Sequence, residues 1–315
     1  MKHLFRLLCL CLLTGLVFAS CEKPSVSEEG GDESEVVNGD IQVRFRVAQI
    51  EQIPFGDSAE GTRATAIGEL CQRISYAIYQ NGERKTVKNQ VYGDEGFGEM
   101  TLSLAAGTYQ VVIVAHNGAE NAQTTDLTKI TFKEDNKLKV TDTFYYYDTL
   151  VVSENCEVNI QLKRVVAMVR FITKDTIPAG VERIRFHYTG GSSTFDATSG
   201  FGIVNSQQTE FREVTEDMIG KQGTFCFYTF PHTTNDTLNV RLTAYGPTNN
   251  IIKEKDFNNV PITQNQITQY KGYFFTEGSD EEEPDSIGDK SDLDGNLTFK
   301  LTVENAEWNL KELTF

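Results

Sequence analysis

The sequence lacks the short motifs that mark most catalytic and metal-binding proteins. It contains no C-x-x-C pair, no H-E-x-x-H, no G-x-S-x-G and no phosphate-binding glycine loop. Tryptophan occurs once and histidine four times in 315 residues. His116, His187 and His232 lie in separate segments without the spacing of metal ligands. We therefore expect no enzymatic activity, no metal site and no cofactor.

Basic residues are scarce as well. Lysine and arginine number 29 against 45 aspartates and glutamates, for a formal net charge of -16. Much of the excess lies in residues 22–40 and 276–296, which hold seven and nine acidic residues and one lysine each. Without a basic patch we expect no nucleic-acid partner. Because both segments have few apolar side chains to offset the entropy of ordering, we predict a disordered tether at 21–40 and an acidic linker or loop at 276–296.

No hydrophobic run is long enough for a membrane span of about 20 residues. The apolar run at residues 7–17 follows the basic residues Lys2 and Arg6 and ends before Ala19-Ser20-Cys21. This order is typical of a bacterial lipoprotein signal peptide over residues 1–20, with a lipid attached to Cys21. The alternative is an ordinary cleaved signal followed by a chance cysteine.

Cysteine usage gives no disulfide framework. Cys9 and Cys11 leave with the signal, and the mature chain beyond Cys21 holds three widely spaced cysteines, namely Cys71, Cys156 and Cys226. An odd, scattered set does not predict a stapled fold. A Cys71–Cys156 bridge and separate buried thiols both stay open.

Alternation of apolar and polar residues dominates the remaining chain. It recurs in residues 41–47, 100–104, 158–162, 165–171, 184–188, 238–242 and 297–303. Such alternation predicts half-buried strands, and Asn81-Gly82 predicts a hairpin. Only short helices are expected, at 126–131 or 215–220. The sequence thus predicts an all-β chain of antiparallel sandwiches, with an N-terminal sandwich at 41–163 and a C-terminal sandwich at 164–275.

Several fragments carry a family likeness through their order and spacing. They are residues 71–79 (CQRISYAIY), 106–109 (AGTY), 115–118 (AHNG), 142–146 (DTFYY), 227–231 (FYTFP) and 268–275 (TQYKGYFF). Together they resemble the FimB-type fimbrial anchor subunits of Bacteroidota, which are outer-membrane lipoproteins related to fimbrillins.

The resemblance implies two tandem transthyretin-like β-sandwiches and a lipid-anchored, outward-facing position in the outer membrane. It also implies a role at the base of a pilus, with a fimbrial stalk subunit as partner bound through strand addition. In the family, stalk subunits lose their N-terminal strand by cleavage after an arginine, whereas anchors are expected to keep it. Here residues 41–47 would be that strand, and Arg63 is the candidate protease site.

The C-terminal segment, residues 297–315, has two interpretations. Its candidate strand residues are Leu297, Phe299, Leu301, Val303 and Trp308. The segment either folds back as an edge of the second sandwich or is donated into the groove of the first stalk subunit.

Two other functions remain as alternatives. One is a surface glycan-binding lipoprotein, which would need an exposed aromatic platform, although the single Trp308 lies near the C-terminus. The other is a stalk or tip fimbrillin that acts as an adhesin.

The lipoprotein signal generates the first prediction. Cys21→Ser is expected to abolish labelling by radioactive fatty acid and to release the protein from the membrane, because the acylated sulfur is lost. Cys156→Ser, which leaves the signal intact, is the matched control and should keep its label. Undiminished labelling of Cys21→Ser would refute lipidation at this residue.

Overall fold

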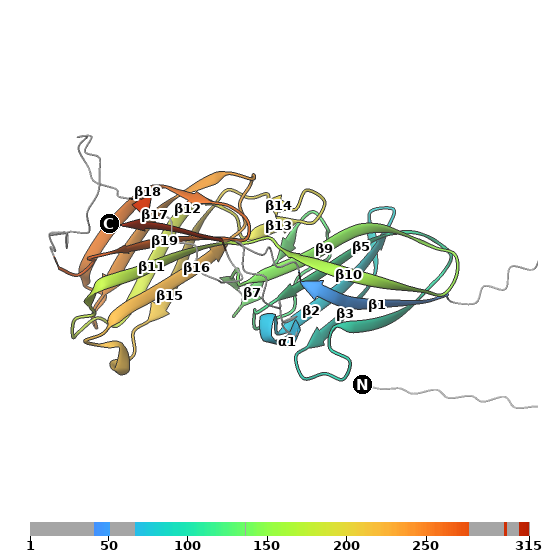
Figure 1. Cartoon of the computed structure of the whole chain (residues 1–315), viewed down its shortest axis with the longest axis horizontal. Helices are drawn as coiled ribbons and strands as arrows, with labels where there is room; N and C mark the ends of the chain where they lie inside the picture. The colour runs from blue at the N-terminus through green and yellow to red at the C-terminus, as the bar shows by residue number, and fades with distance from the viewer. Residues whose placement is uncertain (1–40, 51–66, 136, 277–298, 301–308, 315) are drawn as a thin grey trace, which may run out of the picture. The chain divides into compact units, whose positions relative to one another are not determined.

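The computed structural model describes residues 41–50, 67–135, 137–276, 299–300 and 309–314. Regular structure in these residues is almost entirely β (Figure 1). The exceptions are the single-turn helix α1 (Ile67–Leu70) and the 3-10 turn η1 (Glu216–Met218). The predicted all-β class with two tandem sandwiches is confirmed. Most strand pairs are antiparallel, but three described pairs are parallel, namely β1 with β10, β11 with β19 and β19 with β21.

The first sandwich is built from one sheet in the order β3-β2-β5-β9-β10-β1-β4. Its strands are β1 (Ile41–Ile50), β2 (Arg73–Gln80), β3 (Glu83–Val91), β4 (Glu99–Leu104), β5 (Gly107–His116), β9 (Thr143–Val152) and β10 (Cys156–Arg164). Strands β9 and β10 pair only at Lys163–Tyr145 and Arg164–Phe144. The β10-β1-β4 part therefore packs its apolar face against β2, β5 and β9, and the two faces share one cluster of buried side chains.

Strand β1 lies inside this sheet rather than at its edge. It pairs in parallel with β10 and antiparallel with β4 (Figure 1). Val43 and Phe45 on its inner face have no exposed surface. The chain's own N-terminal strand thus completes the first sandwich.

The second sandwich has two sheets, ordered β16-β11-β19-β21-β20 and β15-β12-β17-β18. The first contains β11 (Ala167–Thr176), β16 (Gln222–Thr229), β19 (Gln266–Gly272), β20 (Phe299–Lys300) and β21 (Asn309–Thr314). The second contains β12 (Arg183–Gly191), β15 (Ser206–Glu213), β17 (Asp236–Tyr245) and β18 (Ile251–Ile262). Aromatic pairs fill the space between them: the ring centroids of Phe171 and Phe186 are 5.8 Å apart, and those of Tyr188 and Phe227 are 4.2 Å apart.

The C-terminal residues belong to this second sandwich. Strand β21 pairs in parallel with β19 and antiparallel with β20, and Leu313 is 2% exposed in the core. Residues 309–314 therefore lie between two strands of their own sheet. Phe299 is opposite Leu313, whereas Leu297, Leu301, Val303 and Trp308 lie outside the described residues.

A third cluster of buried side chains joins the two sandwiches. Tyr79, Val112 and Phe132 from the first half pack in it with Phe195 and Phe230 from the second. A small sheet adds to this junction: it orders β14 (Phe201–Gly202), β13 (Thr194–Asp196) and β6 (Ile130–Thr131). A separate hairpin, β7 (Lys133–Glu134) with β8 (Lys137–Leu138), follows β6. The covalent crossing is short, since β10 ends at Arg164 and β11 begins at Ala167.

The predicted hairpin forms, whereas the predicted short helices form only in part. Asn81 and Gly82 have φ of 54° and 79°, and they connect β2 to β3 in the predicted hairpin, as the positive φ values of such turns require. The helix considered at 126–131 is wrong. There the Asp126 carboxylate accepts hydrogen bonds from the backbone N–H and hydroxyl of Thr128, which holds a turn instead. The segment at 215–220 forms only η1.

Asp175 is the next-to-last residue of β11. Its side chain binds residues 274–276, which follow β19. Its carboxylate accepts backbone N–H groups from Phe274, Phe275 and Thr276 at 3.1, 2.6 and 2.7 Å. Burial opposes the charge of this 8% exposed residue, but the three N–H donors together hold its pKa below the ordinary value. We call this arrangement the Asp175 clip.

Asp175→Asn is expected to lower the free energy of unfolding by about 1.5–3 kcal/mol at neutral pH, because a charged acceptor is replaced by a weaker one. The folded-state pKa lies below the unfolded one, so the contribution exists above the ordinary Asp value of 3.8 and fades as the pH falls through the folded value. Urea titrations at neutral and acidic pH measure both. Glu95→Gln, at an exposed carboxylate, is the control, and a loss that persists at low pH would contradict the clip.

Candidate functional site

The described residues hold no group of three His, Cys, Asp or Glu side chains that could bind a metal ion. Within the same residues, no helix is both long and apolar enough to span a membrane. Cys71, Cys156 and Cys226 are separate thiols, so the structure has no Cys71–Cys156 bridge. Burial raises the pKa of the Cys71 thiol to about 12, which keeps it protonated and unreactive.

The three histidines of the folded part have different environments. His116 is fully buried, and burial together with Arg73 lowers its pKa to about 4. Its Nδ1 accepts the backbone N–H of Gly118 at 3.0 Å. His232 lies 3.0 Å from the Asp236 carboxylate. His187 is on the outer face of β12, beside a surface hollow.

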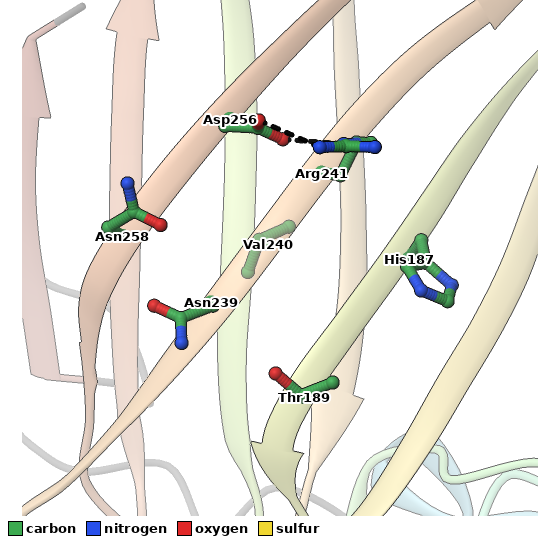
Figure 2. A pocket seen from close by; sticks show the side chains of 7 residues that line it. All are labelled: His187, Thr189, Asn239, Val240, Arg241, Asp256 and Asn258. Carbon is green, nitrogen blue, oxygen red and sulfur yellow. Dashed lines mark hydrogen bonds and ion pairs between the residues drawn. The ribbon is translucent and has the colours of Figure 1, made fainter.

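This hollow lies on the outer face of the β15-β12-β17-β18 sheet and has a volume of about 280 Å³. It is lined by His187 and Thr189 of β12, Asn239, Val240 and Arg241 of β17, and Asp256 and Asn258 of β18 (Figure 2). Alternation explains the lining apart from Val240: residues 184, 186, 188, 238, 240 and 242 are buried in the core, so their neighbours along the strand face outward. We call this feature the polar hollow.

A β-bulge shapes one side of the polar hollow. The β17–β18 register shifts between Leu238 and Val240. Between the buried residues Phe257 and Val260, both Asn258 and Asn259 are exposed, so β18 carries one extra residue here. Asn259 adopts a φ of 54°, and its backbone N–H donates to Asn239 Oδ1 at 3.2 Å. The bulge therefore brings amide side chains of two strands together.

A glycine shapes the β12 side of the same end, across β17 from the bulge. Gly190 follows Thr189 with a φ of 96°, and a Cβ atom there would meet the carbonyl oxygen of Thr237 at 2.5 Å. Only glycine combines this backbone conformation with such a close approach between β12 and β17.

An ion pair forms the charged part of the lining. The Arg241 guanidinium donates to both Asp256 oxygens, at 2.7 and 3.0 Å (Figure 2). This hydrogen-bonded pair lowers the pKa of Asp256 and raises that of Arg241. Glu254 lies 3.7 Å from Arg241 and also 3.7 Å from Arg185. The surroundings of Arg241 are thus balanced in charge.

The His187 ring is fixed by its neighbours on β15. The Gln207 amide nitrogen lies 2.7 Å from Nε2, and Thr209 Oγ1 lies 2.9 Å from Nδ1. Both ring nitrogens of His187 are thus engaged by polar side chains of β15.

Sequence reasoning selected other residues. Cys21, Arg63, Leu297, Leu301, Val303 and Trp308 lie outside the described residues, and Phe299 is in β20. Phe299 is not among the residues that line the polar hollow. The outward alternation of residues 185, 187 and 189 was readable, but the bulge that brings the asparagines together was not.

Residues 34–308 match one protein family, described as a family of unknown function (DUF6562). The chain belongs to this family. The match to DUF6562 spans the polar hollow and β1, and it ends one residue before β21. A search of curated proteins gives no match.

Solved structures give distant likenesses. A candidate adhesin from Bacteroides ovatus is 14% identical with a TM-score of 0.46, over 74% of this chain and 88% of that one. The fimbrial anchor protein Mfa2 from Porphyromonas gingivalis is 13% identical with a TM-score of 0.42, over 70% and 83%. A fimbrial assembly protein from Parabacteroides distasonis is 15% identical with a TM-score of 0.36, over 74% and 90%. These likenesses are too distant to carry a conclusion about function.

Two arginine–aspartate pairs, Arg241–Asp256 and Arg164–Asp142, differ in burial, and this generates a prediction. Arg241→Met is expected to leave the denaturant midpoint unchanged, because the pair is solvent-exposed and such pairs contribute little. Arg164→Met is the matched comparison: its side chain is 3% exposed and donates to both Asp142 oxygens at 2.7 and 2.9 Å. Leaving Asp142 unpaired should cost about 3–5 kcal/mol. An equal loss of stability in the two variants would contradict this prediction, because the exposed pair on the outer face would then stabilise the fold as much as the buried pair does.

Proposed function

We propose that this chain is a non-enzymatic cell-surface lipoprotein that anchors a fimbria to the outer membrane. Attachment to the membrane is assigned to a lipid on Cys21, with residues 21–40 as the tether that separates the lipid from the sandwiches. The signal-like order of residues 1–21 supports this step. The ordered fragments that resemble fimbrial anchor subunits support the rest.

The observation that carries the proposal is the position of β1. The strand is paired on both sides, by β10 and β4, and buries Val43 and Phe45 completely. A chain that lost β1 would expose an apolar groove and two unpaired strand edges, which a partner's strand would have to fill. A chain that keeps β1 has no such vacancy in its first sandwich. It can therefore end a polymer at the membrane rather than extend it in that direction.

The partner in this proposal is a fimbrial stalk subunit bound by strand addition. The candidate donor strand lies in residues 297–315 and includes Leu297, Phe299, Leu301, Val303 and Trp308, because the acidic segment before it gives it reach. Residues 309–314 are paired with β19, which favours self-docking for that part of the C-terminal segment. Residues 309–314 could stay docked while residues 297–303 are donated. This requires β20 to separate from β21, which it pairs with through two residues.

Removing the chain from cells that carry its fimbria is expected to release the stalk into the medium, because the link to the outer membrane is lost. Re-expression of the natural chain should restore cell-bound stalk. Re-expression of Cys21→Ser should instead place the chain and the stalk together in the medium. Immunoblots of cell and medium fractions for both proteins measure this.

Two outcomes would contradict the anchor assignment. Stalk that stays on cells lacking the chain would show that something else anchors it. A surface form that begins at Ala64, found by N-terminal sequencing, would show that β1 is removed after Arg63 and would favour a stalk or tip fimbrillin.

A further inference from the structure

The polar hollow has features that membrane anchoring does not use. It displays hydrogen-bonding groups that lack partners within the described part of the chain: the side chains of Thr189 and Asn258 make no hydrogen bond there. Asn239 accepts through Oδ1 from the backbone of Asn259, which leaves its NH₂ group available to donate. The hollow thus presents a hydroxyl and two amides on three adjacent strands (Figure 2).

The backbone is distorted to present these groups. Without the extra residue, the β17–β18 ladder would continue in register and only one residue would face outward between Phe257 and Val260. Instead the chain places Asn259 in the left-handed region, which few residue types adopt. Bulges and unusual backbone conformations gather next to binding sites, where they re-aim side chains.

Charge selects the kind of ligand. The charged side chains that line the hollow are Arg241 and Asp256, which neutralise each other at 2.7 Å. Both ring nitrogens of His187 already contact side chains of β15, namely Gln207 and Thr209. A free anion would have to compete with Asp256 for Arg241, and a free cation would have to compete with Arg241 for Asp256. A neutral ligand rich in hydroxyl groups meets neither penalty, because each hydroxyl both donates and accepts.

Size selects one ring. A volume of about 280 Å³ is near the lower end of small-molecule sites, roughly 300 Å³. That space suits a single sugar ring, and the adjoining sugar units of a glycan would extend from it over the open face of the sheet. We propose that the polar hollow binds one neutral pyranose unit of a glycan, through the amides of Asn239 and Asn258, the hydroxyl of Thr189 and the Arg241–Asp256 pair.

The affinity for one sugar should be low. The described residues that line the hollow include no Phe, Tyr or Trp, so there is no large ring face for a sugar to stack on and an isolated monosaccharide is expected to bind in the millimolar range. Many copies of the chain on one surface would raise the effective affinity for a repeating glycan without any new contact. This inference does not depend on anchoring, and Cys21→Ser would leave it unaffected.

Saturation-transfer NMR on the purified mature protein tests the proposal. The probes are glucose, galactose, mannose and N-acetylglucosamine, each compared with glucuronate, sialic acid and glucosamine. At least one neutral sugar should give a transfer signal. The double variant Asn239→Ala/Asn258→Ala should weaken the signal at least tenfold. Thr189→Val, which removes the hydroxyl and keeps the side-chain shape, should weaken it as well. Asn159→Ala, at an exposed asparagine of β10 in the first sandwich, should leave it unchanged.

Three outcomes would overturn the proposal: no transfer from any neutral sugar, equal transfer in the double variant, or preference for a charged sugar over its neutral counterpart. Thermal unfolding of each variant is measured in parallel. If the double variant is destabilised, the test of sugar binding at the polar hollow rests on Thr189→Val. Undiminished sugar binding by Thr189→Val would then overturn the proposal.

Discussion

The buried cluster shared by the two sandwiches is the constraint on which the other parts of the fold depend. Strands β2 and β5 contribute to the core of the first sandwich through one face and to this shared cluster through the other. Ile74, Tyr76 and Ile78 face the first core, while Ala77 and Tyr79 face the junction. Because both faces of these strands are out of water, the sandwiches are joined by apolar burial as well as by the short crossing between β10 and β11. Arg164 sits at this crossing, paired with Asp142, hydrogen-bonded to Asn265 at 3.0 Å and stacked over Phe144.

This double burial also explains what could be predicted from the sequence. Strands with one solvent-exposed face, such as β1, β10, β12 and β17, show the alternation of apolar and polar residues from which they were predicted. Strand β2 reads as a nearly continuous apolar run because it has no wet face. The hairpin at Asn81-Gly82 was predictable because its signal is local. The parallel pairings β1–β10 and β11–β19 were not, because partners about 100 residues apart leave no trace in a local pattern.

The candidate site was much less accessible to sequence reasoning than the fold. Metal sites and catalytic nucleophiles leave spaced motifs in a sequence, whereas the polar hollow includes asparagine, threonine and paired charges from three strands. Each is an ordinary outward residue when read along its own strand. Their meeting depends on cross-strand register, and above all on the extra residue at Asn258–Asn259, which shifts one strand by a single position. A positive φ at an asparagine is a property of the folded backbone that composition does not reveal.

The position of β1 has a mechanical consequence. The first described strand begins at Ile41 and is hydrogen-bonded to neighbouring strands along both of its sides. A pull along the direction of β1 acts across the hydrogen bonds to β10 and β4 together, so the load is shared among them in shear. Bonds at the free end of a hairpin would instead be opened one after another, each bearing the full force in turn. The same residues that complete the first sandwich therefore make β1 resistant to being pulled out of it.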